Sequence, residues 1–220
     1  MILLVVNRVL VGLVILLTAA GCQPSAVAAK EKPVTAQSVA LQRGDVSGLQ
    51  RCTASGDLEA VLLNEKSRNP TAYSQNATEW EQWKRLGASD AYFAAYGRTV
   101  ADCDSLSGSG TGAPTGGLVA ALIVRFKNEA VAVRTYGVDA TLLGFGPKDI
   151  AFINLVGGTV TTGSATGLGQ RSVIGSGSVT SSTYYFAFWQ NKVFDSYLVA
   201  YDMPSDDAYR AANDVNQRIR

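Results

Sequence analysis

The chain has 220 residues, a formal charge of +1 and no histidine. Arg8 is the only charged residue before Cys22, so the remaining chain is formally neutral, and no cluster of Lys and Arg suits nucleic acid. Without histidine there is no Ser-His-Asp or Cys-His system and no ordinary catalytic zinc site. We therefore expect no catalytic residue, no metal site and no cofactor, and no partnership with nucleic acid.

Residues 1–21 have the composition of an export signal. Arg8 lies near the start, the run from Val9 to Leu17 is apolar, and the small residues Thr18-Ala19-Ala20-Gly21 precede Cys22. The sequence Ala19-Ala20-Gly21-Cys22 resembles the lipobox of bacterial lipoproteins. This resemblance implies cleavage before Cys22, diacylglycerol on the Cys22 thiol, usually a further acyl chain such as palmitate, and attachment to an extracytoplasmic membrane surface. The alternative is a plain transmembrane anchor.

Residues 22–38 are predicted to be the lipidated cysteine and a flexible tether, because they are small, polar and punctuated by proline. Residues 39–220 are predicted to form a single domain. With Cys22 assigned to lipid, Cys52 and Cys103 remain, and cysteines pair by default in an oxidising compartment. A disulfide between them would close a loop of about 50 residues, worth roughly 4 kcal/mol. The alternative is two buried free thiols.

The elements expected along the domain follow from hydrophobic periodicity and capping residues. They are a helix over 57–67 ended by Asn69-Pro70, a helix from Thr78 to Gly87 capped by Thr78, a strand over 90–100, a glycine-rich loop over 105–117, a strand over 118–126, a helix over 129–136 capped by Asn128, a short helix over 148–154, short strands within 157–177, strands over 182–190 and 193–202, and a helix over 205–219 capped by Ser205.

The order strand–strand–helix occurs twice, which predicts two internal repeats over about 41–137 and 160–220. The fold class is therefore expected to be α+β, built from duplicated strand–strand–helix units as a mainly antiparallel sheet with helices packed on it. In layout the domain loosely resembles the extracytoplasmic α+β sensor or ligand-binding lipoproteins of bacteria.

Short motifs elsewhere add little. Arg43-Gly44-Asp45 matches an integrin-binding tripeptide by only three residues, and Asn76-Ala77-Thr78 has the form of a glycosylation site. The glycines of 105–117 spell neither a phosphate-binding loop nor a dinucleotide-binding motif.

The two C-terminal strands are apolar on both faces. A hairpin turning at Asn191-Lys192 would pair Trp189 with Phe194, and alternation would place Tyr185, Ala187, Trp189, Phe194, Ser196 and Leu198 on one face. The other face would carry Tyr184, Phe186, Phe188, Asp195, Tyr197 and Tyr201.

One of these two faces must be core. The candidate ligand-binding residues are Tyr184, Phe186, Asp195, Tyr197 and Tyr201, which would line a groove for a small apolar or sugar-like ligand. The competing interpretation is a sheet covered on both sides, with Phe186 and Phe188 packed against the apolar stripe of the last helix and Asp195 at the solvated end of the hairpin.

The function expected from the sequence is that of a membrane-tethered extracytoplasmic binding or interaction domain. Its partners would be the membrane, through the lipid, and a small ligand or another envelope protein. The alternative is a cell-envelope hydrolase that uses carboxylates or a Ser/Lys pair. Two converging carboxylates in a deep pocket would favour that alternative.

Overall fold

The computed structural model describes residues 33–106, 116–136, 143–144, 146, 148–179 and 181–219. The predicted signal peptide, Cys22, most of the predicted tether and the centre of the glycine-rich loop lie outside the described residues. The described elements are α1 (Ala36–Val39), the short 3₁₀ helix η1 (Arg43–Asp45), β1 (Gln50–Arg51), β2 (Gly56–Asp57), α2 (Leu58–Arg68), α3 (Pro70–Leu86), β3 (Ala88–Gly97), α4 (Val100–Leu106), β4 (Leu118–Phe126), α5 (Glu129–Tyr136), α6 (Lys148–Leu155), β5 (Thr159–Thr162), the 3₁₀ helix η2 (Gly163–Thr166), β6 (Ser172–Val179), β7 (Ser182–Asn191), β8 (Phe194–Tyr201) and α7 (Ser205–Arg218).

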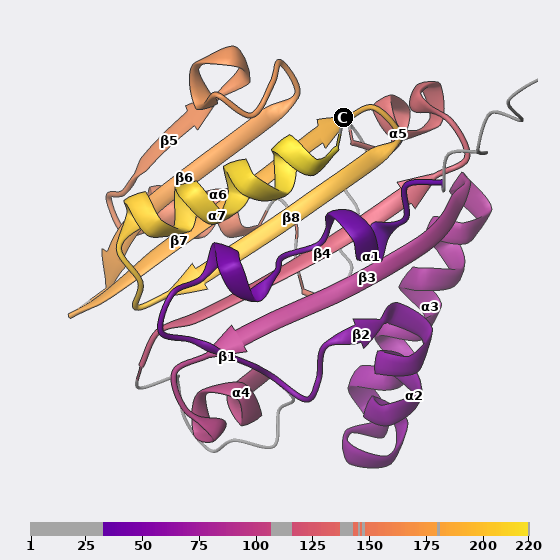
Figure 1. The fold of residues 1–220 in the computed structure, drawn as a ribbon, viewed down its shortest axis with the longest axis horizontal. Helices are drawn as coiled ribbons and strands as arrows, with labels where there is room; N and C mark the ends of the chain where they lie inside the picture. The colour runs from indigo at the N-terminus through magenta and orange to yellow at the C-terminus, as the bar shows by residue number, and fades with distance from the viewer. Residues whose placement is uncertain are drawn as a thin grey trace, which may run out of the picture. The chain divides into compact units, whose positions relative to one another are not determined.

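The domain is built on one antiparallel sheet with helices packed on both faces (Figure 1). The strand order is β1-β3-β4-β8-β7-β6-β5, and β2 also pairs with β3. The predicted α+β class, with a mainly antiparallel sheet, is confirmed. Among the described residues, no helix combines the length and the apolar character needed to cross a membrane.

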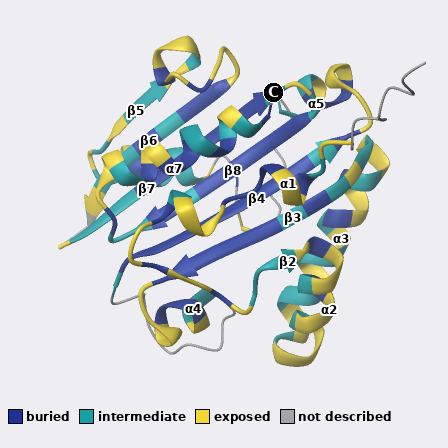
Figure 2. Cartoon of the chain, in the orientation of Figure 1, coloured by how far each residue is buried: buried dark blue, intermediate teal, exposed yellow. Residues whose placement is uncertain are grey.

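Strand β4 shows why both faces are covered. Its sequence, Leu118 to Phe126, is apolar at nearly every position, and all its residues except Arg125 are buried. Because side chains alternate across a strand, Val119 and Ile123 enter one hydrophobic core while Leu118 and Leu122 enter the other. Figure 2 shows the buried central strands between partly exposed helices.

Helix α7 covers the first of these two faces. Its apolar stripe, which includes Ala208, Ala212 and Val215, packs over Trp189 and Leu198. The helix begins at Ser205 as expected, but Pro204 occupies the N-cap position and no side chain caps it. The predicted capping role of Ser205 was wrong.

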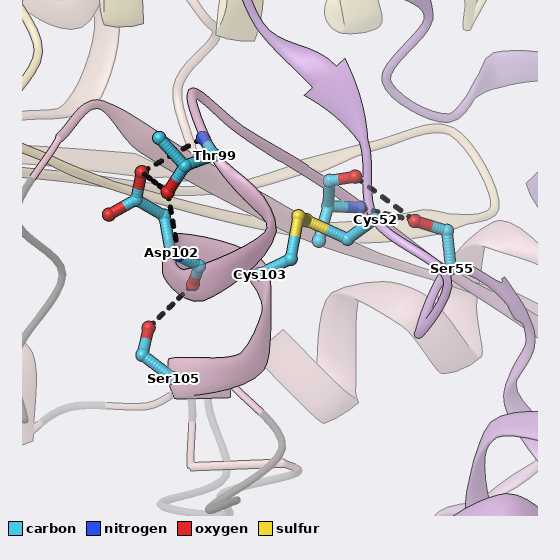
Figure 3. The surroundings of a disulfide bond; sticks show 7 residues. Cys52, Ser55, Thr99, Asp102, Cys103 and Ser105 are labelled. Carbon is cyan, nitrogen blue, oxygen red and sulfur yellow. Dashed lines mark hydrogen bonds between the residues drawn. A yellow bond between two sulfur atoms is a disulfide. The ribbon is translucent and has the colours of Figure 1, made fainter. Parts of the chain in front are cut away.

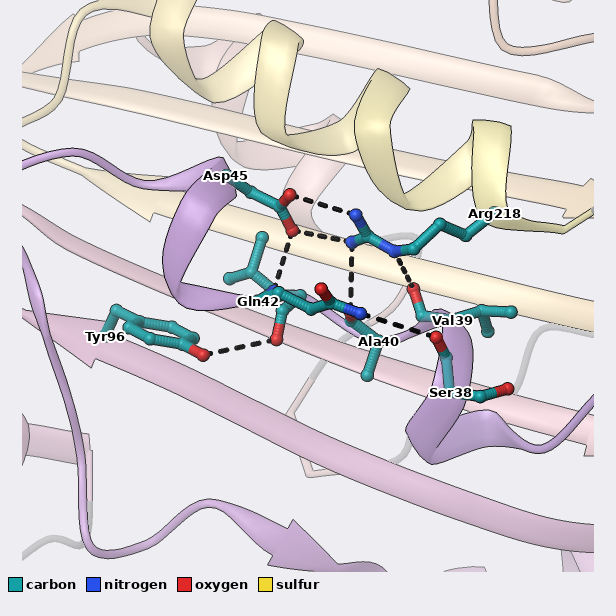
Figure 4. Close-up of polar contacts among 8 residues, drawn as sticks. Ser38, Val39, Ala40, Gln42, Asp45, Tyr96 and Arg218 are labelled. Atoms are coloured by element: carbon teal, nitrogen blue, oxygen red, sulfur yellow. Dashed lines mark hydrogen bonds and ion pairs between the residues drawn. The ribbon is translucent and has the colours of Figure 1, made fainter.

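The segment from α1 to η1 lies beside α7 on the same face of the sheet, and Arg218 joins this segment to α7 (Figures 1 and 4). Arg218 donates two hydrogen bonds to the Asp45 carboxylate, at 2.6 and 2.9 Å, and others to the carbonyl oxygens of Val39 and Ala40. The Arg43-Gly44-Asp45 tripeptide thus forms η1 and uses Asp45 within the fold. Buried Ala36 shows that the packed domain begins inside the predicted tether.

Helices α2, α3, α5 and α6 contribute to the core on the opposite face. Helix α3 starts at Pro70, eight residues before the predicted start at Thr78. Asn69 caps it by accepting a hydrogen bond from the Ala72 amide, and Pro70 suits the first helical position. Thr78 lies inside this helix, where its hydroxyl donates to the Ser74 carbonyl, so its predicted capping role was wrong.

The hairpin of β7 and β8 turns one residue later than expected. Asn191 pairs with Phe194, and Trp189 therefore lies opposite Ser196 instead of Phe194. Lys192, in the turn, has a φ of 50°, within the left-handed region. Because partners shift by two positions, each side chain keeps its predicted face.

The strands of the two predicted repeats are adjacent, with β4 of the first pairing with β8 of the second. The helices that follow these strands, α5 and α7, pack on opposite faces of the sheet. The helices thus do not occupy equivalent positions, and the duplication stays a prediction.

Candidate functional site

A cleft of about 530 Å³ opens on the face of the sheet that carries α5 and α6. It extends over β5, β6, β7 and β8. Its described lining residues are Tyr136, Gly146, Ile150, Val160, Thr162, Gly163, Gln170, Arg171, Ser172, Val173, Phe188 and Tyr197. A concave surface with an apolar lining and a few polar groups is typical of a small-molecule site.

The floor of the cleft is aromatic. Phe188 and Tyr197 are cross-strand partners on β7 and β8, with ring centroids 5.2 Å apart. The ring centroids of Phe186 and Phe188 are 4.9 Å apart, and Trp83 of α3 meets Tyr197 edge-on with a centroid distance of 5.8 Å. Phe188 packs against Phe186 and Tyr197, and Tyr197 also packs against Trp83, so these contacts fix the positions of the two rings that form the floor.

Asp195 is the unusual residue of this region. It lies two positions before Tyr197 on the same face of β8, it is 0 % exposed, and neither carboxyl oxygen has a hydrogen-bond partner among the described residues. Burial raises the pKa of Asp195 to about 8. The carboxyl group is therefore mainly protonated and neutral at pH 7, as expected where no partner stabilises its charge.

Two tyrosines of the cleft lie within electrostatic reach of Asp195. Burial raises the pKa of Tyr136 to about 12, and the nearby Asp195 carboxyl contributes to that rise. Burial also raises the pKa of Tyr197 well above its ordinary value, with smaller contributions from Asp195 and Tyr136. Asp195 thus belongs to the same electrostatic environment as the two tyrosines that face the cleft.

The indole Nε1 of Trp83, whose ring contacts Tyr197, is another buried polar atom that has no partner in the described part of the chain. Buried donors and acceptors are usually paired, so each unpaired one calls for an explanation, such as a bound water or ligand. The aromatic floor thus lies next to two buried polar groups, those of Asp195 and Trp83, that have no partner among the described residues.

The rim of the cleft near β6 is polar. Exposed Arg171 lies 3.5 Å from Oε1 of Gln190, whose amide nitrogen donates to the Lys192 carbonyl at 2.6 Å. The Ser172 hydroxyl lies 2.6 Å from the Gly169 carbonyl oxygen, which fixes the loop that leads into β6. The cleft therefore has a positive charge at its rim and an apolar interior.

Of the five residues proposed from the sequence as ligand-binding, only Tyr197 lines the cleft. Phe186 is fully buried in the core. Tyr184 and Tyr201 meet edge-on at 5.4 Å, and Tyr184 also contacts Phe152 of α6 at 5.1 Å. Asp195 is buried, not placed at the solvated end of the hairpin.

Sequence reasoning also misplaced the helix that covers these aromatic residues. Phe186 and Phe188 face away from the stripe of α7, which packs on the opposite face of the sheet. Residues from α5, α6 and the β5–β6 region form the cleft with Tyr197, and sequence reasoning missed them. Tyr136 and Arg171 are the most informative of these. No local pattern marks them, because they reach the cleft only through tertiary packing.

The predicted disulfide between Cys52 and Cys103 is present (Figure 3). It links the segment before β2 to α4, which sequence reasoning had not expected as a helix. The turn before α4 is fixed by Asp102, whose carboxylate accepts hydrogen bonds from the Thr99 amide at 3.0 Å and the Thr99 hydroxyl at 2.7 Å. The Ser55 hydroxyl bonds the β3 backbone at Ala95 beside the disulfide.

A smaller cavity of about 130 Å³ lies near the disulfide, between α2 and β3. Val61 and Phe93 are among its apolar lining residues. Its polar residues include Glu65 and Asn76, which already bond each other at 2.9 Å. Its volume is about a quarter of that of the larger cleft, which leaves less room for a ligand.

No protein-family model matches the chain, and no curated protein sequence matches it. Among solved structures, the chain is similar to the extracellular domain of PknH from Mycobacterium tuberculosis, with a TM-score of 0.40 and 8% sequence identity. The match covers 86% of this chain and 98% of that chain. No residue role is transferred from it.

Proposed function

We propose that the protein is a lipid-anchored extracytoplasmic binding protein whose small ligand occupies the cleft beside α5 and α6. The observation that carries this proposal is the cleft itself, with its aromatic floor of Phe188 and Tyr197 and its polar rim. Such a site can bury most of a small ligand while a few polar groups orient it.

The proposed location rests on two observations. The lipobox-like sequence Ala19-Ala20-Gly21-Cys22 favours lipid attachment at Cys22. The Cys52–Cys103 disulfide is typical of proteins that fold in an oxidising compartment. Two or more acyl chains would be enough for stable attachment to a membrane.

The described lining of the cleft favours binding over hydrolysis. It includes no Asp or Glu, whereas a histidine-free hydrolase of the kind considered above would need carboxylates or a Ser/Lys pair that converge on the substrate. Ser172 lines the cleft, but its hydroxyl is occupied by backbone carbonyls and by Thr166, and no Lys is among the described lining residues.

Substitution of Cys22 by Ser should release the protein from the membrane, because Ser cannot accept the thioether-linked lipid. Membrane fractionation after a carbonate wash measures the effect, with the wild-type chain as the reference. If Cys22→Ser stays in the washed membrane fraction, the apolar segment is a transmembrane span and the lipid-anchor proposal is wrong.

Filling the cleft tests the binding function. Thr162 is exposed at the cleft wall on β5, so Thr162→Trp places an indole in the cleft without disturbing a buried side chain. Thr161→Trp, on the other face of the same strand, is the matched control. We expect native mass spectrometry of the full chain, purified gently in detergent, to show a co-purified small molecule on the wild type and on Thr161→Trp.

We expect Thr162→Trp to lose that molecule and to melt at the temperature of the wild-type chain after its ligand has been removed. Equal retention by both tryptophan variants would place the ligand elsewhere and contradict the proposal. Absence of any bound small molecule from the wild-type chain, under conditions that preserve lipid attachment, would count against it equally.

A further inference from the structure

The chemistry beneath the cleft indicates which class of ligand it accepts, and this inference rests on the binding function proposed above. Three aromatic rings, from Tyr136, Phe188 and Tyr197, line one region of the cleft. The negative faces of aromatic rings attract organic cations, and more strongly when water is excluded. Aromatic rings alone, however, would equally accept a neutral apolar group.

Asp195 distinguishes these two possibilities. Its carboxyl group lies within electrostatic reach of both Tyr136 and Tyr197, yet among the described residues no cation and no donor pairs with it. A buried acid without a partner is costly to the fold, whereas an apolar residue would pack at the same place without that cost. A cation bound in the cleft would favour the ionised form of Asp195 and serve as its counter-charge.

None of the described groups that surround Asp195 acts as a counter-charge to its carboxylate. From α5 the group facing Asp195 is Tyr136, and from β8 it is Tyr197. The cross-strand partners of Asp195 are Val124 on β4 and Gln190 on β7, neither of which titrates, and Trp83 of α3 contacts the neighbouring Tyr197. Arg171 lies beyond Gln190 at the rim, and Arg125 projects to the other face of the sheet, where it pairs with Asp90.

We propose that the cleft binds a small organic ammonium ion, which rests against the rings and hydroxyls of Tyr136 and Tyr197, with the carboxylate of Asp195 as its counter-charge. Binding would then release the Asp195 proton to solvent, because the bound cation favours the ionised acid. Arg171 at the rim suits ligands that carry an anionic or polar group at the other end.

The test uses n-butylamine as the probe and the full chain in detergent micelles. 4-Fluorophenylalanine reports binding through the ¹⁹F resonance of Phe188, assigned with Phe188→Leu, while Phe194 on the opposite face serves as the internal reference. The amine stays protonated from pH 6 to pH 9, as a lysine side chain does. We expect the affinity of the protein for the amine to rise roughly tenfold or more from about pH 6 to about pH 9. This rise follows if binding lowers the pKa of Asp195 by about one unit or more.

Two comparisons give the test its specificity. n-Butanol should bind with an affinity that does not change with pH, and Asp195→Asn should make amine binding weak and independent of pH. Amine affinity that does not respond to pH, or that survives Asp195→Asn unchanged, would overturn the ammonium proposal. If butanol alone perturbs Phe188, or if Thr162→Trp removes a co-purified ligand while the amine fails to bind, the binding function stands and only the ligand class is wrong.

Discussion

Replacing Asp195 by Asn is expected to stabilise the protein at neutral and alkaline pH. Asn has nearly the same size and shape but cannot ionise, so it removes the cost of burying a carboxylate without a partner. Burial raises the pKa of Asp195 from 3.8, the ordinary value for a solvated side chain, to about 8 in the fold. A difference of this size corresponds to an effect on the order of 5 kcal/mol.

The direction of the pH dependence follows from proton binding. Between about pH 4 and pH 8 the unfolded chain has lost the Asp195 proton while the folded chain retains it, so the folded state binds more protons and the free energy of unfolding falls as pH rises. The advantage of Asp195→Asn should therefore be small near pH 4, grow steadily, and level off above pH 8.

Urea denaturation of both proteins at several pH values measures this difference. Asp206→Asn, which changes an exposed carboxyl in the first turn of α7, is the control and should alter stability by about 1 kcal/mol or less. An Asp195→Asn variant that is less stable than the wild type at pH 8 would show that Asp195 is ionised and paired in the folded protein.

Truncating Phe186 to Ala should destabilise the protein by about 3–5 kcal/mol, the cost typical of a buried aromatic side chain. Phe186 is 0 % exposed and lies between Phe188 and the backbone of β6. Chemical denaturation gives the free energy of unfolding directly. A loss below about 1 kcal/mol, combined with weaker ligand binding, would instead place Phe186 in a ligand groove.

A second substitution, at Gly175, tests the same packing. It is the cross-strand partner of Phe186, and a Cβ at position 175 would lie only 2.2 Å from the Phe186 ring. Gly175→Ala should therefore destabilise the wild type, yet be neutral or stabilising when Phe186 is already Ala, because the methyl group then enters the vacated space. Additive effects of the two substitutions would contradict this packing.

The strands and helices with strong periodicity could be predicted from the sequence, and β4 and α5 were predicted at the residues where they occur. Helix α3 was predicted eight residues short because Pro70 was taken only as the end of the preceding helix. Proline ends one helix and begins another equally well, and the local sequence did not distinguish the two roles. Helix α4 was missed because its seven residues run into the glycine-rich loop.

The hairpin illustrates what alternation can and cannot predict. Assigning Phe186 and Trp189 to opposite faces needed only the two-residue period of a strand, and this was correct. Which helices cover each face depends on how the chain crosses the sheet, and sequence reasoning placed α7 over the wrong face. The burial of Asp195 was missed because a single acid near a turn is usually solvated.

The ionisation of Asp195 in the folded protein is the most direct test of a neutral acid beneath the cleft. The ¹³C resonance of its side-chain carboxyl, assigned by its loss in Asp195→Asn, can be followed by NMR as the pH is raised. We expect the Asp195 carboxyl of the free protein to titrate at about pH 8, because burial without a partner raises the pKa of this acid. Saturating n-butylamine should lower the pH of that midpoint. A midpoint near 4 in the free protein would contradict a neutral, uncompensated acid at this position.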